Sequence, residues 1–281
     1  MIKIVDGAQR GRVAIIDTGT TPKTTTTPLD DATKAARDRI VGNGWDIEDE
    51  LTQDLMDPLI RELKDQSHWS DVVFLSAAGA RETISGAIAT IPDWSGAEND
   101  AIQATAADRP TLDTNGISGR CAADFDGAGD ALEVPTSPLT LTKPFTVVSL
   151  WTTQLTGNVI SWSFENASDD NYIGVGTNFR DVKLYSSGET PGAGSTLSEN
   201  TAYIVSIEWD GTDFSVYLDG TFDYKVSPSS TNWQTATDEF NIGLSKSNSL
   251  FWDGYIISIL GIQATGVRDE VEDIYTNYYS L

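Results

Sequence analysis

From residue 71 onward, short apolar stretches alternate with turn residues, which is the pattern of an all-β protein. The expected strands are about 5 to 12 residues long and are separated by Asp-Gly, Ser-Gly, Asn or Pro. They are VVFLSA (72–77), TISGAIATIPDW (83–94), FTVVSLWTTQ (145–154), NVISWSFE (158–165), NYIGVG (171–176), DVKLYSS (181–187), AYIVSIEWD (202–210), FSVYLDG (214–220), FNIGLS (240–245) and YIISILGIQ (255–263). This spacing of strands and turns is typical of a β-sandwich.

The expected strands differ in how many of their faces are apolar. In residues 203–210, one set of alternating positions is Tyr, Val, Ile and Trp and the other is Ile, Ser, Glu and Asp, so this strand has one dry and one wetter face. FTVVSLW (145–151) is apolar on both faces, which predicts a central strand. Only VRDEVEDIYTNYY (267–279) has a helical pattern in this part of the chain.

The first 70 residues have a different composition and a different pattern of apolar positions. Residues 12–17 (RVAIID) predict a short strand, and the Thr- and Pro-rich residues 18–31 predict an extended arm or linker. A short helix, ATKAARDRIV (32–41), follows, with Asp30 or Asp31 as its cap. It is expected to stop at Gly42-Asn43-Gly44.

A second helical pattern carries an apolar stripe. Its members are spaced by four and share a face: Ile47, Leu51, Leu55, Leu59 and Leu63. Pro58 must kink this helix or begin a new one with Asp57 as its N-cap. The stripe needs a cover, which is either the chain's own main domain or a neighbouring subunit. We assign these five residues to assembly.

Charge narrows the range of partners. The chain carries a formal net charge of −24 and has a pI near 4.1. Most of the excess of acidic over basic residues lies after residue 70. Residues 1–70 hold 13 acidic and 9 basic residues, whereas residues 71–281 hold 29 acidic and 9 basic residues. Nucleic acid and anionic lipid both require a Lys/Arg surface, so neither is an expected partner.

No apolar run approaches the ~20 residues of a membrane helix, so membrane insertion is not expected. The N-terminus MIKIVDGAQRGRV lacks the apolar stretch of a signal peptide, which favours synthesis and folding in a cytoplasm. Cys121 is the single cysteine and is expected to be a buried core residue.

Five sequence segments, taken in their order along the chain, resemble those of a known family. They are DWSGAENDAIQATAADRPTL (93–112), GRCAADFDGAGDALEVP (119–135), PFTVVSLW (144–151), YIVSIEWDGTDFSVYLDG (203–220) and FNIGLSKSNSLFWDGYIISILGIQATGVRDEVEDIYTNYY (240–279). Residues 71–281 resemble a laminin-G-like, concanavalin A-like domain. The resemblance implies a two-sheet antiparallel jelly-roll sandwich, preceded by the arm and helices of residues 1–70. It specifies a fold and no activity.

The run FDGAGDALEVP (125–135) could be an acid/base pair, a calcium loop or a turn. An EF-hand loop starting at Asp124 fails, because Ala128 and Pro135 stand where ligands are needed. Glycines accept positive φ and aspartates bond their own backbone, which favours a tight turn. A jelly-roll Ca²⁺ site that shares one of these carboxylates is the alternative.

Catalytic constellations are not evident. His68 is the only histidine, which excludes a Ser-His-Asp triad and a multi-histidine metal site. The closest match to a retaining glucanase strand is EWDGTD (208–213), but it ends in Asp and its centre predicts a hairpin turn. No G-x-S-x-G, P-loop or Rossmann fingerprint occurs. We therefore expect a protein that is not an enzyme.

Binding remains as the expected activity. Aromatic faces can stack on sugar rings, and Asp and Asn oxygens can bond hydroxyls directly or through Ca²⁺. The candidate ligand residues surround a predicted loop between two strands: Trp162, Asp169, Asp170, Asn171 and Tyr172. The alternative interpretation places Trp162 in the core and the aspartates in solvent.

An acidic jelly roll behind an arm and amphipathic helices resembles the surface proteins of bacteriophage particles. We therefore expect a virion structural protein of the head-decoration, spike or fibre type, assembled in the host cytoplasm. Residues 1–70 would bind other virion proteins or further copies of the chain, and the sandwich would bind host surface glycans. The alternatives are a glycan-cleaving hydrolase, a bacterial adhesin domain and a structural cap without a ligand.

Overall fold

The computed structural model of this chain describes residues 28–48, 51–135, 138–154, 158–165, 172–178, 181–186, 194–228, 234, 239–245 and 250–281. The expected strand at 12–17 and nearly all of the Thr/Pro-rich arm lie outside these ranges. Within them, no helix is both long enough and apolar enough to cross a membrane.

The helical elements are α1 (Asp31–Gly42), the π-helix η1 (Leu51–Met56), α2 (Asp57–Asp65), the 3-10 turns η2 (Trp69–Asp71) and η3 (Ala106–Asp108), and α3 (Arg268–Tyr279). The first strands are β1 (Asp46–Ile47), β2 (Val72–Ala77), β3 (Ala80–Ile84), β4 (Ala87–Ile91), β5 (Ala101–Ile102), β6 (Thr111–Ile117), β7 (Arg120–Asp126), β8 (Leu132–Val134) and β9 (Phe145–Trp151). The later strands are β10 (Asn158–Glu165), β11 (Tyr172–Asn178), β12 (Asp181–Ser186), β13 (Tyr203–Trp209), β14 (Phe214–Leu218), β15 (Thr221–Val226), β16 (Glu239–Ile242), β17 (Leu244–Ser245), β18 (Leu250–Phe251) and β19 (Asp253–Ile262).

One sheet, called the helix-side sheet, has the antiparallel order β15–β14–β13–β9–β19. On its other side β19 pairs with β7 over Asp253–Ile256 and with β2 over Ser258–Ile262. All seven residues of β9 are buried, and β9 has a partner on both edges. The prediction of a central strand at 145–151 is therefore confirmed.

The second sheet, called the open sheet, has the antiparallel order β12–β11–β10–β16–β8–β5. Strand β4 joins the two layers, because it pairs with β5 and also contacts β6, the neighbour of β7. A large apolar core fills the space between the sheets and includes Phe74, Phe125, Trp151, Trp162 and Phe240. The chain thus folds as the antiparallel two-sheet jelly-roll sandwich that the sequence predicts.

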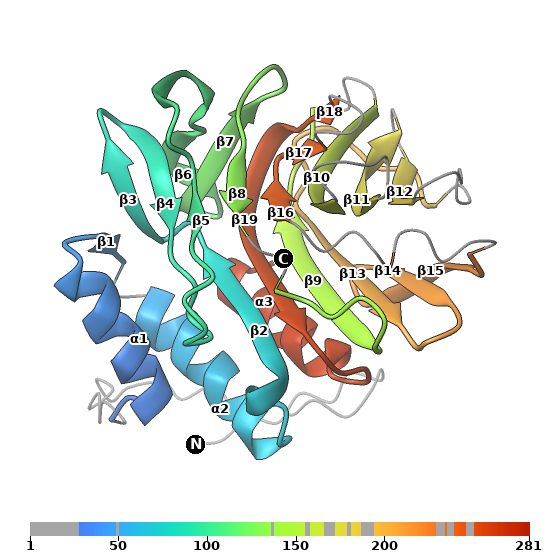
Figure 1. Cartoon of the computed structure of the whole chain (residues 1–281), viewed down its shortest axis with the longest axis horizontal. Helices are drawn as coiled ribbons and strands as arrows, with labels where there is room; N and C mark the ends of the chain where they lie inside the picture. Colours follow the sequence, from blue (N-terminus) through green and yellow to red (C-terminus); the bar gives the residue numbers. More distant parts are fainter. Residues whose placement is uncertain are drawn as a thin grey trace, which may run out of the picture.

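A second apolar core lies between the helix-side sheet and the helices (Figure 1). Val148, Leu150, Ile204, Leu260 and Ile262 project from this sheet toward α1, η1, α2 and α3. The leucine stripe fills the same core, with exposures of 0–2% at Leu51, Leu55, Leu59 and Leu63. Ile47 is half-buried in β1, which pairs with β3.

The chain's own main domain covers the stripe, which is one of the two covers that the sequence allows. The four leucine side chains assigned to assembly are therefore not available to a second subunit, because the chain itself already removes them from solvent.

Pro58 lies where the π-helix η1 changes into α2, and the helix is not interrupted there, because Met56 keeps helical dihedrals (φ −68°, ψ −44°). Pro58 stands in the first turn of α2, where its missing N–H costs nothing. Asp57 is not the N-cap, because Met56 holds that position. Instead, Asp57 accepts a hydrogen bond from the backbone N–H of Asp30 (2.6 Å) and pairs with Arg61.

The predicted helices at 32–41 and 267–279 are confirmed as α1 and α3. At the start of α1, the Asp30 carboxylate accepts from the N–H of Ala32 at 2.8 Å and so caps the helix. The long strand expected at 83–94 is instead the hairpin β3–β4. Its two-residue turn has positive φ at Ser85 (57°) and Gly86 (86°), as this kind of tight turn requires.

Candidate functional site on the open sheet

One row of side chains crosses the outer face of the open sheet and its continuation into β3. We call it the outer-face row; it consists of Ser163, Asn241, Glu133, Ile102, Thr90 and Glu82. Each member lies directly opposite the next on a neighbouring strand, from β10 through β16, β8, β5 and β4 to β3. At the far end, Thr90 Oγ1 donates to Glu82 Oε2 at 2.7 Å.

The alternation of each strand places this row on the outer face. In β10, Trp162 and Phe164 enter the core between the sheets, so Ser163 and Glu165 must face the other way. In β16, Phe240 and Ile242 are core residues, so Glu239 and Asn241 face outward. In β8 the same reasoning puts Glu133 outward between Leu132 and Val134.

Exposure varies along the row: it is greatest at Ile102, and Thr90 beyond it is only 5% exposed. Ser163 and Asn241 are fully buried at 0%, Glu133 and Glu82 are partly exposed, and Ile102 is 42% exposed. Strand β17 shelters the buried end, where Ser163 Oγ lies 2.8 Å from the Leu244 carbonyl oxygen. The end on β8, β5, β4 and β3 is the one that solvent can reach.

Asn241 is the unusual member of the row. Neither its Oδ1 nor its Nδ2 has a hydrogen-bond partner among the described residues, although the side chain is completely buried. A buried amide atom without a partner costs about 1–3 kcal/mol. Such a group points to a ligand or ordered water that would satisfy it.

A second pair of carboxylates lies beside the row. Glu165 of β10 and Glu239 of β16 are directly opposite each other, with exposures of 1% and 5%. Opposed residues of an antiparallel pair have Cβ atoms ~4.5–5.5 Å apart. Ser163 Oγ lies 2.6 Å from Glu165 Oε1, which connects this pair to the row.

The arrangement suits recognition of a polyhydroxylated ligand. Carboxylates accept hydrogen bonds from hydroxyl groups, an amide both donates and accepts, and the exposed side chain of Ile102 offers an apolar contact. Within the described residues, no group of three or more His, Cys, Asp or Glu side chains could hold a metal ion. The side chains of the row offer hydrogen-bond donors and acceptors.

The ligand residues expected from the sequence are placed only in part. Trp162 is 1% exposed, packs against Phe164 and Phe240, and donates from Nε1 to Ser149 Oγ at 3.2 Å. It belongs to the core and cannot stack on a sugar from solvent. Tyr172 begins β11 and is paired with Glu165, whereas Asp169, Asp170 and Asn171 lie outside the described residues.

The run 125–135 is a turn that carries the chain from β7 in one sheet to β8 in the other. Asp126 Oδ1 accepts from the backbone N–H groups of Ala128 (2.8 Å), Gly129 (3.0 Å) and Asp130 (3.3 Å). Partial burial raises the pKa of Asp126, but these N–H groups outweigh it, so the pKa is lowered. Burial, followed by the charge of Asp126, raises the pKa of Asp130 to about 6. The turn interpretation is confirmed.

The EWDGTD run also forms a turn, between β13 and β14. Asp210 Oδ1 accepts from the N–H groups of Thr212 (2.7 Å) and Asp213 (2.8 Å), and Glu208 Oε1 accepts from the N–H of Gly266 (2.9 Å). These carboxylates have structural partners, and they do not line one strand as a retaining glucanase requires.

No protein-family model and no curated protein matches this sequence. Solved structures match its fold at low identity. The sialidase of Trypanosoma rangeli is 15% identical with a TM-score of 0.55, over 80% of this chain and 38% of the sialidase. An arabinofuranosidase, solved with arabinofuranosyl-α-1,2-xylobiose, is 10% identical with a TM-score of 0.53, over 74% of this chain and 59% of the enzyme. The chain thus spans well under half of the sialidase, and the likeness concerns the fold alone.

The sequence analysis missed Glu133, Glu165, Glu239 and Asn241 as candidate site residues. A signal was present, because NVISWSFE and FNI alternate polar with large apolar side chains. What the sequence does not provide is the pairing of β10 with β16 and of β16 with β8, which join segments far apart in the chain.

Proposed function

We propose that this chain is a non-enzymatic structural protein of a bacteriophage virion, of the head-decoration, spike or fibre type, that binds host surface glycans through its outer-face row. The observation that carries the glycan part is the solvent-accessible part of the row, with the partly exposed carboxylates Glu133 and Glu82 and the 42% exposed Ile102 on a face that the described helices do not cover. The lectin-like jelly roll agrees with it, and similar folds occur in a sialidase and an arabinofuranosidase, enzymes that act on sugars.

The proposed virion anchor lies ahead of the N-terminal helices. The residue pattern assigns the anchor to residues 1–70, but α1, η1 and α2 are packed on the chain's own sheet. We therefore assign contact with other virion proteins, and with further copies of the chain, to residues 1–27. Residues 18–27 of this segment include seven Thr and have little to bury, so they suit an arm that contacts a partner.

A glycan array tests the binding part. Wild type should bind a subset of glycans, whereas Ile102→Ser and Glu133→Gln should reduce the signal about tenfold through lost apolar contact and hydrogen bonding. Val41→Ser is the matched control, because Val41 is 49% exposed on α1, away from the row. Equal binding by wild type and both row variants would contradict the proposal. A parallel array with EDTA shows whether Ca²⁺ takes part.

Particle assembly tests the virion part. A chain that lacks residues 1–27 should stay folded as a purified protein but should be missing from assembled phage particles. Incorporation of this truncated chain at the wild-type level would show that residues 1–27 are not the anchor.

One observation favours a second function, glycan cleavage. Glu165 and Glu239 face each other across adjacent strands, and retaining glycosidases use two carboxyl groups ~5 Å apart. Against it, both side chains are at most 5% exposed. Turnover of a glycan by wild type that is lost in both Glu165→Gln and Glu239→Gln would establish the hydrolase. An adhesin domain of a bacterial surface protein would bind glycans without entering any particle.

A further inference from the structure

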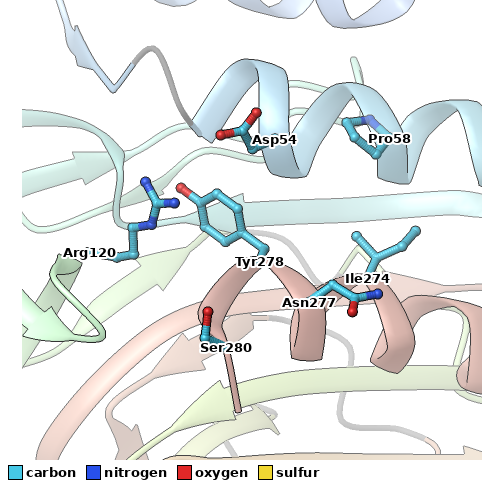
Figure 2. A pocket seen from close by; sticks show the side chains of 7 residues that line it. All are labelled: Asp54, Pro58, Arg120, Ile274, Asn277, Tyr278 and Ser280. Carbon is cyan, nitrogen blue, oxygen red and sulfur yellow. The ribbon is translucent and has the colours of Figure 1, made fainter. Parts of the chain in front are cut away.

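A pocket of about 420 Å³ opens on the helix side of the sandwich (Figure 2). Asp54 and Pro58 line it from η1 and α2, Arg120 from the start of β7, and Ile274 and Asn277 from the last turns of α3. Its volume falls within the ~300–1,000 Å³ of small-molecule sites.

Arg120 gives this pocket its charge. Its guanidinium lies over the ring of Tyr278, 4.4 Å from the ring centroid, and Figure 2 shows the two side chains together at one wall. Stacking fixes the plane of the guanidinium and leaves its N–H edge free to donate two parallel hydrogen bonds.

Arg120 also differs from four of the other six arginines in the described residues. Arg39, Arg61, Arg81 and Arg268 each form a salt bridge with a carboxylate. No carboxylate of the described residues forms one with Arg120. In a chain with a net charge of −24, this leaves a cation at the pocket wall without a salt bridge to a described carboxylate.

The other polar groups of the pocket are also available. Asp54, Asn277 and Ser280 are exposed, and their side chains make no hydrogen bond with any described residue. They supply a carboxylate, an amide and a hydroxyl around one cavity. Ile274 and Pro58 supply apolar surface on the same walls.

We propose that this pocket binds a sugar that carries a carboxylate, such as a uronic or sialic acid. Arg120 would hold the sugar carboxylate in a bidentate pair, which is the geometry that a guanidinium favours. Asp54, Asn277 and Ser280 would bond the hydroxyl groups, and Ile274 and Pro58 would contact the C–H face of the ring. A phosphate ligand fits less well, because its second charge would face Asp54 and a strongly acidic protein.

This site is independent of the outer-face row. The pocket is built from α3, η1, α2 and β7, on the helix-covered side, whereas the row lies on the outer face of the other sheet. Row variants should leave the pocket's ligand binding unchanged, so the failure of one proposal can be told from the failure of the other.

Calorimetric titration with galacturonate, N-acetylneuraminate and galactose tests the pocket. At least one of the two acidic sugars should bind about tenfold or more tightly than galactose, since a hydrogen bond to a charged group is stronger than one to a neutral group. Arg120→Gln should remove this preference. Arg37→Gln is the control, because it makes the same change in net charge on α1, outside the pocket.

Two further results would overturn the proposal: neither acidic sugar binds wild type, or Arg120→Gln binds them as wild type does. Should Arg120→Gln fail to fold, the double variant Asn277→Ala, Ser280→Ala addresses the same site with two exposed residues. It should weaken acidic-sugar binding about tenfold with an unchanged melting temperature. Unchanged affinity in that variant would equally count against the pocket.

Discussion

The two sheets of this sandwich have outer faces of opposite character. The helix-side sheet presents Val148, Leu150, Ile204 and Leu260, all 0–1% exposed beneath the helices. The open sheet carries mostly polar side chains along its outer-face row, of which Glu133 and Glu82 are partly exposed. An apolar outer face must be covered to be soluble, while a polar one can serve as a recognition surface.

This difference changes how the N-terminal helices are understood. Burying one leucine side chain is worth about 1.5–3 kcal/mol, and four leucines of the stripe are buried on the helix-side sheet. The helices α1 and α2 are therefore part of the folded domain. The comparison can be tested from the largest expected effect to the smallest.

Truncation should have the largest effect. Removing residues 1–70 exposes the apolar face of the helix-side sheet, so we expect insoluble protein or a broad, non-cooperative melt. Removing residues 1–27 keeps the helices and should leave the melting temperature unchanged. Thermal unfolding of both truncated chains, followed by circular dichroism, measures this difference in stability. A soluble product of the longer truncation with a sharp melt would mean that the helices are dispensable.

A single leucine of the stripe should reproduce part of this loss. Leu59→Ala leaves a cavity between α2 and the sheet and should lower the free energy of unfolding by about 2–5 kcal/mol. Ile102→Ala, on the exposed end of the outer-face row, should change it by less than about 0.5 kcal/mol. Urea denaturation measures both. Equal losses would remove the distinction between the two faces.

Asp93 should be the next most sensitive position, because it holds the loop that fastens α1. Its fully buried carboxylate accepts from Leu75 N and Ser95 N (both 2.9 Å), Asn99 N (3.1 Å) and Ser95 Oγ (2.6 Å).

Asp100 of the same loop pairs with Arg39 of α1. We expect Asp93→Ala to cost about 2–3 kcal/mol in urea denaturation, because it leaves buried N–H groups without an acceptor. Glu98→Ala, an exposed change in this loop, serves as the control; a similar cost there would mean that the loop is sensitive for another reason.

The turn between the two sheets should show the smallest effect, in its pH dependence. Burial raises the pKa of Asp130 to about 6, against ~3.9 for an unfolded aspartate. The ionised form is thus penalised in the folded state, and this penalty grows as the pH rises from about 4 to 6. Asp130→Asn should stabilise the protein by an amount of order 1 kcal/mol at pH 7 and by almost nothing at pH 3.

Asp126→Asn is the matched variant with the opposite sign. The pKa of Asp126 is lowered, so its ionised form stabilises the fold above the unfolded pKa and this contribution is lost as the pH falls. The variant should be destabilised at pH 7 and should approach wild type in acid. Chemical denaturation of both variants at the two pH values measures these differences, and identical pH profiles for the two would refute the assignment.

Local chemistry made the helices and central strands predictable from sequence. Asp30 caps α1, Pro58 lies in the first turn of α2, and β9 is apolar on both faces, each for a reason confined to a few neighbouring residues. The hairpin at Ser85-Gly86 was missed because apolar residues continue on both sides of its turn. The outer-face row could not be predicted, since it depends on the register between strands of distant origin, such as Asn241 opposite Glu133.

The position of β19 constrains how this protein can be made. Strand β19 (Asp253–Ile262) separates β9 from β2 and β7 at the middle of the helix-side sheet, yet it follows all three in the chain by roughly a hundred residues or more. Until the ribosome has released it, those earlier strands have bare hydrogen-bonding edges that invite pairing with other nascent chains. The sandwich can therefore close only once β19 has been synthesised, and a stalled or nonsense product ending before residue 253 would be a seed for aggregation.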